Sequence, residues 1–126
     1  MSNKSLLVVD DSATFRQLLC MSLVRVEGIN QSNITEAANG EEALNKVQEK
    51  HFDLVLTDIN MPKMTGLEFV EKVRNELKRP ELPIIIITTK GAESDVDKGM
   101  KLGANGYLSK PVSMVQLREL INGYLK

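Results

Sequence analysis

The chain has 126 residues, 42% of them hydrophobic, with 16 Lys and Arg against 17 Asp and Glu and a formal net charge of −1. This length fits one domain, whose core would bury roughly two thirds of the unfolded chain's surface without disulfides or a structural metal. The charge balance excludes the basic field that attracts nucleic acids or anionic lipids. We therefore expect neither nucleic acid nor a membrane as a partner.

The cysteine content and the N-terminal residues indicate a compartment. Cys20 is the only cysteine and lies in an apolar run, so no intrachain disulfide can form and a reducing setting is favoured. Residues 1–5 are polar and precede only four consecutive apolar residues, which is too few for a signal peptide or a membrane span. These features predict a soluble cytoplasmic protein.

Short apolar runs alternate along the chain with stretches of helical spacing. Strands are predicted at 6–9, 34–38, 54–56, 84–87 and 106–109, and helices around 15–23, 43–47, 67–77, 96–100 and 117–124. The strands at 6–9, 54–56 and 84–87 are apolar at consecutive positions, which is typical of parallel strands covered on both faces. Five β-α units in a row predict an α/β fold with a doubly wound, five-stranded parallel sheet.

Turn and capping residues agree with this alternation. Glycines at 28 and 103 stand where left-handed helix ends are expected. The pairs Asn39 with Glu42, Thr65 with Glu68, and Ser113 with Gln116 each have the spacing of a reciprocal capping box.

Polar residues follow four of the five predicted strands. Asp10 and Asp11 end the first, Asp58 the third, Thr88 the fourth and Lys110 the fifth. Ligands of open parallel sheets bind at the carboxyl ends of the strands. We therefore expect three carboxylates, the two hydroxyls of Thr88 and Thr89, and an ammonium group to meet at one edge of the sheet.

Three carboxylates at one place cannot all stay ionised without a cation or a proton between them. An all-oxygen cluster suits Mg²⁺, and the absence of His and Cys at these positions disfavours zinc. If a phosphate is recruited, Asp58 is the best nucleophile because it lies between the Asp10 and Asp11 pair and Lys110. Asp10 and Asp11 are then the metal carboxylates. Thr88 would supply a hydroxyl donor to the phosphoryl oxygens, and Lys110 would supply a positive charge.

Four segments carry a resemblance to a known family over essentially the whole chain. They are Leu7 to Ser12, Asp58 to Gly66, Ile86 to Thr88 and Gly103 to Pro111. Together, in this order and spacing, they resemble the receiver domains of two-component response regulators, most closely the single-domain regulators of chemotaxis. The resemblance implies a flavodoxin-like three-layer sandwich whose five-stranded parallel sheet has the order 2-1-3-4-5.

The resemblance also implies roles for the site residues. Asp58 would accept a phosphoryl group from the phosphohistidine of a histidine kinase. Asp10, Asp11, Asp58 and the backbone carbonyl of Asn60 would bind Mg²⁺, for which Mn²⁺ could substitute. The hydroxyl of Thr88 and the ammonium of Lys110 would contact the phosphoryl oxygens. The protein would then be a signalling switch with slow autodephosphorylation, and not an enzyme with a separate substrate.

The response to phosphorylation is implied in the same way. Thr88 would move inward and Tyr107 would turn from exposed to buried, which is a population shift that a partner can read. The target protein would dock on the fourth helix, fifth strand and fifth helix, and a phosphatase is a further partner. Residues 1–126 would form one receiver domain with no output domain. The Lys110–Pro111 peptide bond would be cis, as is usual in the family.

The chain departs from the family pattern at a few positions. Thr65 replaces an acidic residue, although its capping box gives it a structural role. Thr89 is bulkier than the usual Ala or Gly and could narrow access to the phosphoryl group. Asn60 and Lys90 stand where the family tunes the phosphoryl lifetime. His51, the only histidine, lies in a polar turn and is expected to be a surface residue.

Two other functions remain open from sequence. A phosphate-independent interaction module of the same fold would keep the sheet without the switch. A small aspartyl-nucleophile phosphatase would use similar groups, but such enzymes place two Asp residues two positions apart on the first strand. Asp58 is followed instead by Ile59 and Asn60.

Overall fold

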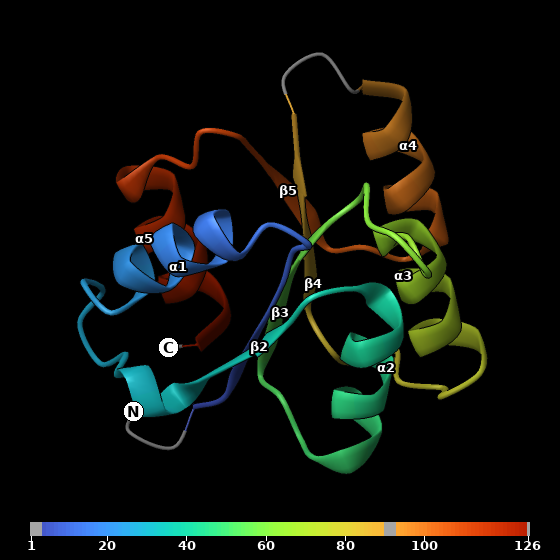
Figure 1. Ribbon diagram of the computed structural model, residues 1–126, viewed down its shortest axis with the longest axis horizontal. Helices are drawn as coiled ribbons and strands as arrows, with labels where there is room; N and C mark the ends of the chain where they lie inside the picture. Colours follow the sequence, from blue (N-terminus) through green and yellow to red (C-terminus); the bar gives the residue numbers. More distant parts are fainter. Residues whose placement is uncertain (1–3, 90–92, 126) are drawn as a thin grey trace.

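The computed structural model describes residues 4–89 and 93–125, which form five β-α units. In chain order the elements are β1 (Leu6–Val9), α1 (Ala13–Leu23), the 3₁₀ helix η1 (Gln31–Asn33), β2 (Ile34–Ala37), α2 (Gly40–Glu49), β3 (Leu54–Asp58), α3 (Gly66–Asn75), β4 (Ile84–Thr88), α4 (Glu93–Leu102), β5 (Gly106–Ser109) and α5 (Met114–Leu125). The predicted strands and helices are all present, and η1 is the one addition among the described residues (Figure 1).

The strands form one parallel sheet of order β2-β1-β3-β4-β5. β1 pairs with both β2 and β3, so Leu6 lies between Ile34 and Leu54. The register of β3 and β4 places Asp58 opposite Ile87, one residue before the end of β4. This flavodoxin-like topology confirms the predicted fold, and it brings the carboxyl ends of β1 and β3 side by side.

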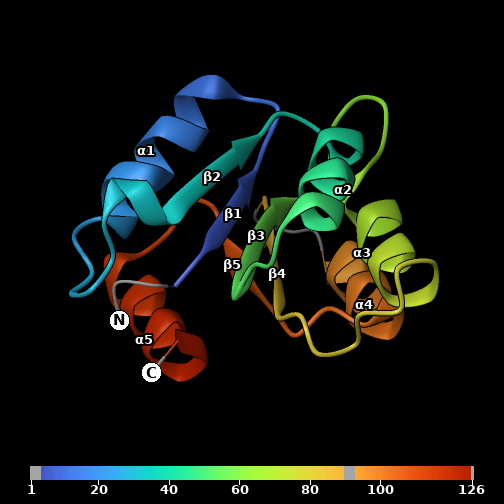
Figure 2. The same ribbon diagram turned by 90° about the horizontal axis from the view of Figure 1, so that it is seen from below.

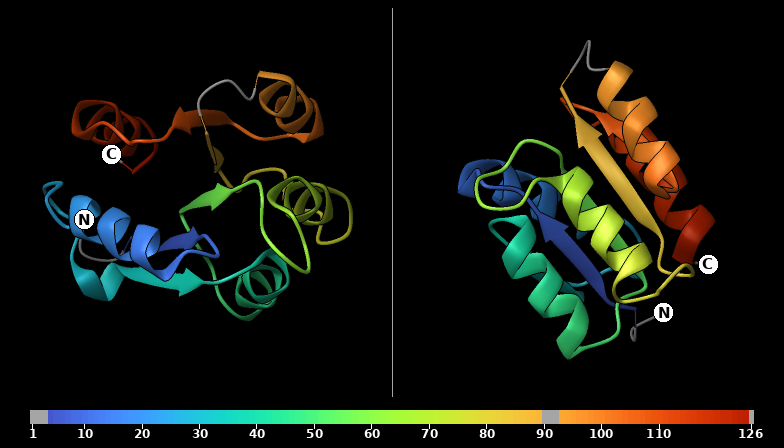
Figure 3. Two further views of the ribbon diagram at one scale, coloured as in Figure 1. Left: turned by 45° about the horizontal axis from the view of Figure 1, so that its top comes forward. Right: turned by 90° about the vertical axis from the view of Figure 1, so that its right-hand side faces the viewer.

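Helices cover both faces of the sheet. α1 and α5 lie on one face, and α2, α3 and α4 lie on the other (Figures 1 and 2). The helices run alongside the strands, as the right-hand view of Figure 3 shows. No helix of the described chain is long and apolar enough to cross a membrane.

The consecutive apolar residues of the central strands pack on both faces of the sheet. On β1, Leu6 and Val8 pack in the cluster beneath α1 and α5, whereas Leu7 and Val9 pack in the cluster beneath α2 and α3. All four side chains are fully buried. Because neighbouring residues of a strand point to opposite faces, burial on both sides requires an unbroken apolar run.

The predicted residues cap their helices, but the full reciprocal box forms at only one of the three predicted positions. At the start of α5, the Ser113 hydroxyl accepts from the Gln116 backbone N–H at 3.3 Å, and the Gln116 side chain does not return the bond. Thr65 and Glu68 form the full reciprocal box at the start of α3. At α2, the Asn39 side chain accepts from the Glu42 backbone N–H as predicted, but the Glu42 carboxylate accepts from the backbone N–H of Ala38 and not from that of Asn39. The reciprocal bond is displaced by one residue because Glu42 reaches past the capping residue.

Gly28 and Gly103 adopt the predicted left-handed backbone, with φ of 93° and 116°. Gly103 directly follows α4 and ends it, whereas Gly28 lies in the turn beyond α1. The predicted third helix is shorter than its apolar spacing indicated, because Leu77 lies after the end of α3 and packs on the core from the following turn.

Candidate functional site

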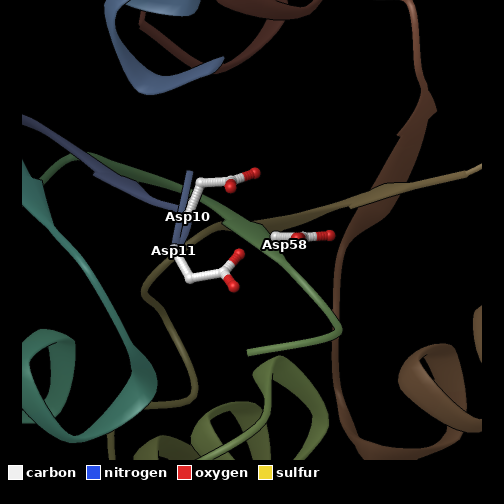
Figure 4. Close-up of side chains that lie close together, drawn as sticks. All are labelled: Asp10, Asp11 and Asp58. Atoms are coloured by element: carbon white, nitrogen blue, oxygen red, sulfur yellow. The ribbon is translucent and has the colours of Figure 1, made fainter. Parts of the chain in front are cut away.

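The three carboxylates predicted to meet do so at the carboxyl edge of the sheet (Figure 4). Asp10 and Asp11 follow β1, and Asp58 is the last residue of β3. One carboxylate oxygen from each residue lies within 4.8 Å of the others. Asp10 and Asp58 are buried, whereas Asp11 is exposed to solvent. The cluster is therefore set into the protein and open on one side.

The loop after β3 fixes the Asp58 side chain from behind. Asp58 Oδ1 accepts a hydrogen bond of 2.8 Å from the backbone N–H of Ile59. The backbone N–H of Gly66, at the start of α3, donates to the carbonyl of Ile59 at 2.8 Å and closes the loop. A Cβ on Gly66 would lie 2.1 Å from the carbonyl oxygen of Asp58. Only glycine permits this close approach of the two backbone segments. The second carboxylate oxygen, Asp58 Oδ2, faces the site, 3.6 Å from Lys110 Nζ.

Asp10 is held by the loop that follows it. Its Oδ1 accepts from the backbone N–H of Ser12 at 2.8 Å. The guanidinium of Arg16 donates to the backbone carbonyl of Asp10 and, at 3.0 Å, to the carboxylate of Glu36 on β2. The side chain and the backbone of Asp10 are thus both fixed from α1.

Lys110 contributes the ammonium group of the site. Its Nζ lies 3.2 Å from Asp10 Oδ2 and 3.6 Å from Asp58 Oδ2. The backbone N–H of Lys110 donates to the carbonyl of Thr88 at 2.8 Å, which ties the end of β5 to the end of β4. The Lys110–Pro111 peptide bond is cis, as the resemblance implied.

The electrostatics of the cluster favour an added cation. Burial raises the pKa of the Asp58 carboxyl above its usual range, and the nearby charges of Asp10 and Asp11 act in the same direction. The ammonium of Lys110 and the hydrogen bond from Ile59 oppose this effect without overcoming it. Lys110 pairs with Asp10 and Asp58 only, so the three carboxylates of the cluster are not balanced by it alone. The donor atoms of the cluster are all oxygen, which suits Mg²⁺.

The two predicted switch residues lie on adjacent strands. Thr88 is the last residue of β4 and is buried. Tyr107 lies on β5, paired with Ile86, and 54% of its surface is exposed. This is the exposed position that the resemblance implies before phosphorylation, and the switching itself stays a prediction.

The remaining predicted positions are Asn60, Thr89, Lys90 and His51. Asn60 is exposed two residues after Asp58, and metal binding by its backbone carbonyl stays a prediction. Thr89 is exposed after β4, and Lys90 lies outside the described residues. His51 is exposed and pairs with Asp53 at 3.1 Å, which confirms its position on the surface.

Sequence reasoning missed two residues that contact the site. Phe15 was predicted only as an apolar helix residue, yet its ring centroid lies 4.2 Å from Lys110 Nζ. Arg16 carried no prediction. A weak signal existed, because both lie in the first turns of the helix that follows Asp10 and Asp11, where side chains can reach back to the strand end. Nothing in the sequence indicated which of these side chains does so.

Comparison with known families decides the assignment. The model of the response regulator receiver domain matches residues 6–122. The chain belongs to the response regulator receiver family. This receiver is a signalling switch and not an enzyme that turns over a separate substrate, which argues against the aspartyl-nucleophile phosphatase alternative. In receivers the phosphodonor is a histidine kinase and the output passes through a target, and the acidic triad agrees with the divalent metal site of the family.

Curated relatives and solved structures place this receiver near chemotaxis proteins. It is 42% identical over 115 residues to the chemotaxis protein CheY1 of Helicobacter pylori, covering 90% of each chain. It is 39% identical over 121 residues to a chemotaxis protein CheY homologue of Campylobacter jejuni, covering 95% of this chain and 91% of the relative. The structure of Vibrio cholerae CheY4 superposes with a TM-score of 0.83 at 35% identity, covering 97% and 98% of the two chains.

Proposed function

We propose that this receiver is a phosphorylation switch in which Asp58 accepts a phosphoryl group from a histidine kinase. One observation carries the proposal: Lys110 Nζ lies between the carboxylates of Asp10 and Asp58, 3.2 and 3.6 Å from them. An ammonium group at this position can neutralise phosphoryl oxygens on Asp58 without a large movement. The site therefore has an acceptor, a fixed cation and a cluster of metal-binding oxygens at one strand edge.

The transfer exchanges one bond to phosphorus for another. Oδ2 of Asp58 attacks the phosphorus of a phosphohistidine and forms an acyl phosphate. The phosphorus–nitrogen bond breaks, and its electron pair stays on the imidazole nitrogen, which takes up a proton. Asp58 must be ionised to attack. Lys110 favours that ionised form, although burial opposes it.

Mg²⁺ is the proposed cofactor, and Mn²⁺ could replace it. Asp10, Asp11 and Asp58 would hold the ion, with the backbone carbonyl of Asn60 as a further ligand. The fit rests on the donor set: three carboxylate oxygens lie within 4.8 Å of one another and one residue of the three is exposed. The ion would supply charge neutralisation for the phosphoryl oxygens.

Phosphorylation would change the surface at the β5 edge of the sheet. The Thr88 hydroxyl would turn to the phosphoryl oxygens, and Tyr107 would fill the space that opens on β5. The proposed docking surface is α4, β5 and α5, where Met100, Tyr107 and Val115 expose 42%, 54% and 61% of their surfaces. A partner that prefers the buried position of Tyr107 shifts the population toward it.

The pathway we propose is chemotaxis, because the curated relatives reported above are chemotaxis proteins. In it, a histidine kinase would be the phosphodonor and a phosphatase would shorten the lifetime of the signal. The target would be a protein that binds the α4, β5 and α5 surface. Binding that is independent of phosphorylation would favour the interaction-module alternative.

The test is labelling by acetyl phosphate, a small donor that needs no docking surface. The unaltered protein should gain one phosphoryl group in the presence of Mg²⁺, as measured by intact mass, and EDTA should prevent the gain. Asp58→Asn should abolish labelling. The matched control is Asp97→Asn on the exposed side of α4, which should be labelled like the unaltered protein. Undiminished labelling of Asp58→Asn would overturn the proposal.

A further inference from the structure

Lys110 has a third neighbour besides the two carboxylates. Its Nζ lies 4.2 Å from the centroid of the Phe15 ring, within the range of a cation–π contact. The Lys110 side chain is 24% exposed, so water screens this contact only in part. The ammonium is therefore bounded by Asp10, by Asp58 and by an aromatic face.

The ring is placed by the same short segment that places Asp10. Ser12 N–H donates to Asp10 Oδ1 at 2.8 Å, and Ser12 Oγ accepts from Phe15 N–H at 3.2 Å as the N-cap of α1. One capping residue thus fixes both a carboxylate that attracts Lys110 and a ring that contacts it. The Phe15 side chain also packs against the core beneath α1 and α5.

The Phe15 ring face can attract the Lys110 ammonium without competing as an oxygen acceptor for its N–H donors, which a hydrogen-bonding neighbour could not do. Lys110 has three N–H donors, and the site offers oxygens of Asp10 and Asp58 and, after transfer, of the phosphoryl group. A ring face attracts the charge without being a conventional oxygen acceptor, so it need not displace those oxygens. It also lies beside an apolar depression of about 440 Å³ that Leu18, Leu19, Pro111 and Val112 help to line.

We propose that Phe15 is a positioning residue that holds the Lys110 ammonium beside Asp58 through its ring face. The inference rests on the proposed function, in which Lys110 contacts the phosphoryl oxygens on Asp58. Without the ring, the ammonium would lie with Asp10, the nearer carboxylate at 3.2 Å, or extend into solvent. The Lys110 ammonium would then lie beside the Asp58 carboxylate in a smaller fraction of the molecules.

The experiment replaces the ring while keeping its apolar bulk. Phe15→Leu should lower the rate of labelling by acetyl phosphate with Mg²⁺ about 3- to 30-fold, the range of a partly desolvated cation–π contact. Phe15→Tyr and Phe15→Trp keep the face and should stay within about twofold of the unaltered rate. Leu18→Ala alters the same depression but keeps the Phe15 ring, and it should leave the rate unchanged. Equal rates for Phe15→Leu and the unaltered protein would overturn the inference.

A spectroscopic measurement separates positioning from packing. In the metal-free protein, the ε-methylene protons of Lys110 should show an upfield ring-current shift by NMR that is lost in Phe15→Leu and kept in Phe15→Tyr. Should Phe15→Leu fail to fold, fluorinated phenylalanines at position 15 keep the shape and weaken the ring face. The labelling rate should then fall stepwise with each added fluorine, and a flat series would overturn the inference.

The inference and the proposed function fail in different ways. An unshifted Lys110 signal in the unaltered protein, with labelling still abolished by Asp58→Asn, would overturn the role of Phe15 alone. Undiminished labelling of Asp58→Asn would overturn the proposed function, whatever the Lys110 signal shows.

Discussion

The guanidinium of Arg16 donates a hydrogen bond to the backbone carbonyl of Asp10, so a charged side chain of α1 supports the strand end that carries the acidic cluster. The same guanidinium pairs with Glu36 at 3.0 Å, but half of the Glu36 side chain is exposed. Hydrogen bonds to charged donors contribute about 1.5–3 kcal/mol, whereas exposed ion pairs contribute about 0.2–1 kcal/mol. The contact with Asp10 is therefore the stronger of the two.

Arg16→Ala should accordingly lower the free energy of unfolding by about 1.5–3 kcal/mol. Glu36→Gln removes only the exposed pair and should cost about 1 kcal/mol or less. Urea unfolding of both variants measures the difference. Equal losses would show that the hydrogen bond to Asp10 adds little.

Gly66 should tolerate no side chain, because its Cβ would lie 2.1 Å from the Asp58 carbonyl oxygen. We expect Gly66→Ala to lower the free energy of unfolding by about 2 kcal/mol or more and to reduce labelling at Asp58 by displacing the loop. Gly123 is the matched control, since a Cβ added there, inside α5, would have nothing within 4 Å. Gly123→Ala should stabilise the protein by about 0.4–1 kcal/mol. The midpoint of thermal unfolding should fall in Gly66→Ala and rise in Gly123→Ala. A rise in both variants would contradict the close approach at Gly66.

Asp58 should lower the stability of the metal-free protein at neutral pH. Burial raises the pKa of its carboxyl in the folded state, so folding favours the protonated form. The contribution of Asp58 to stability is then fully present below the ordinary carboxyl pKa of 3.8 and is lost as the pH rises through the raised value. In EDTA at pH 7, Asp58→Asn should unfold at a higher temperature than the unaltered protein, and the difference should shrink toward pH 3. A difference that grows on acidification would contradict this sign.

Added Mg²⁺ should stabilise the folded protein by binding to the acidic cluster. A ligand that binds only the folded state stabilises it by about 2.7 kcal/mol at a hundred times its dissociation constant. The midpoint of thermal unfolding should rise with Mg²⁺ in the unaltered protein and much less in Asp11→Asn, which lacks the exposed ligand of the cluster. An equal rise in both would place the ion elsewhere.

Cys20 should react slowly with thiol reagents. Burial raises the pKa of its thiol to about 11, with the charge of Glu36 acting in the same direction and Arg16 opposing it. At pH 8 the thiolate fraction, and with it the rate of reaction with a disulfide reagent, should be about a hundredfold below that of an exposed cysteine. Unfolding in urea should restore the ordinary rate. Fast reaction of the folded protein would contradict the raised pKa of the half-buried Cys20 thiol.

The fold could be predicted from the sequence because the apolar pattern of each central strand indicates that both of its faces are covered. Leu6 to Val9 has no polar position, so only a sheet covered on both faces can bury it, and parallel strands then bring Asp10 and Asp58 to the same edge. The acidic cluster was predictable for the same reason. The positions at which β1 and β3 end are enough to place the three carboxylates together.

The supporting contacts were not predictable, because they depend on how side chains cross between elements. Whether Phe15 reaches the core or Lys110 depends on the phase of α1, and its side chain contacts both. The displaced bond of Glu42 depends on one rotamer. Neither leaves a spacing signal along the chain.

The central claim is that the phosphoryl group is carried by Asp58. Borohydride reduces an acyl phosphate on aspartate to homoserine, so treatment of the labelled protein followed by peptide mass spectrometry locates the modified residue. We expect homoserine at position 58 only, and only when Mg²⁺ was present during labelling. Homoserine at position 10 or 11, or a labelled protein with position 58 unchanged, would contradict it.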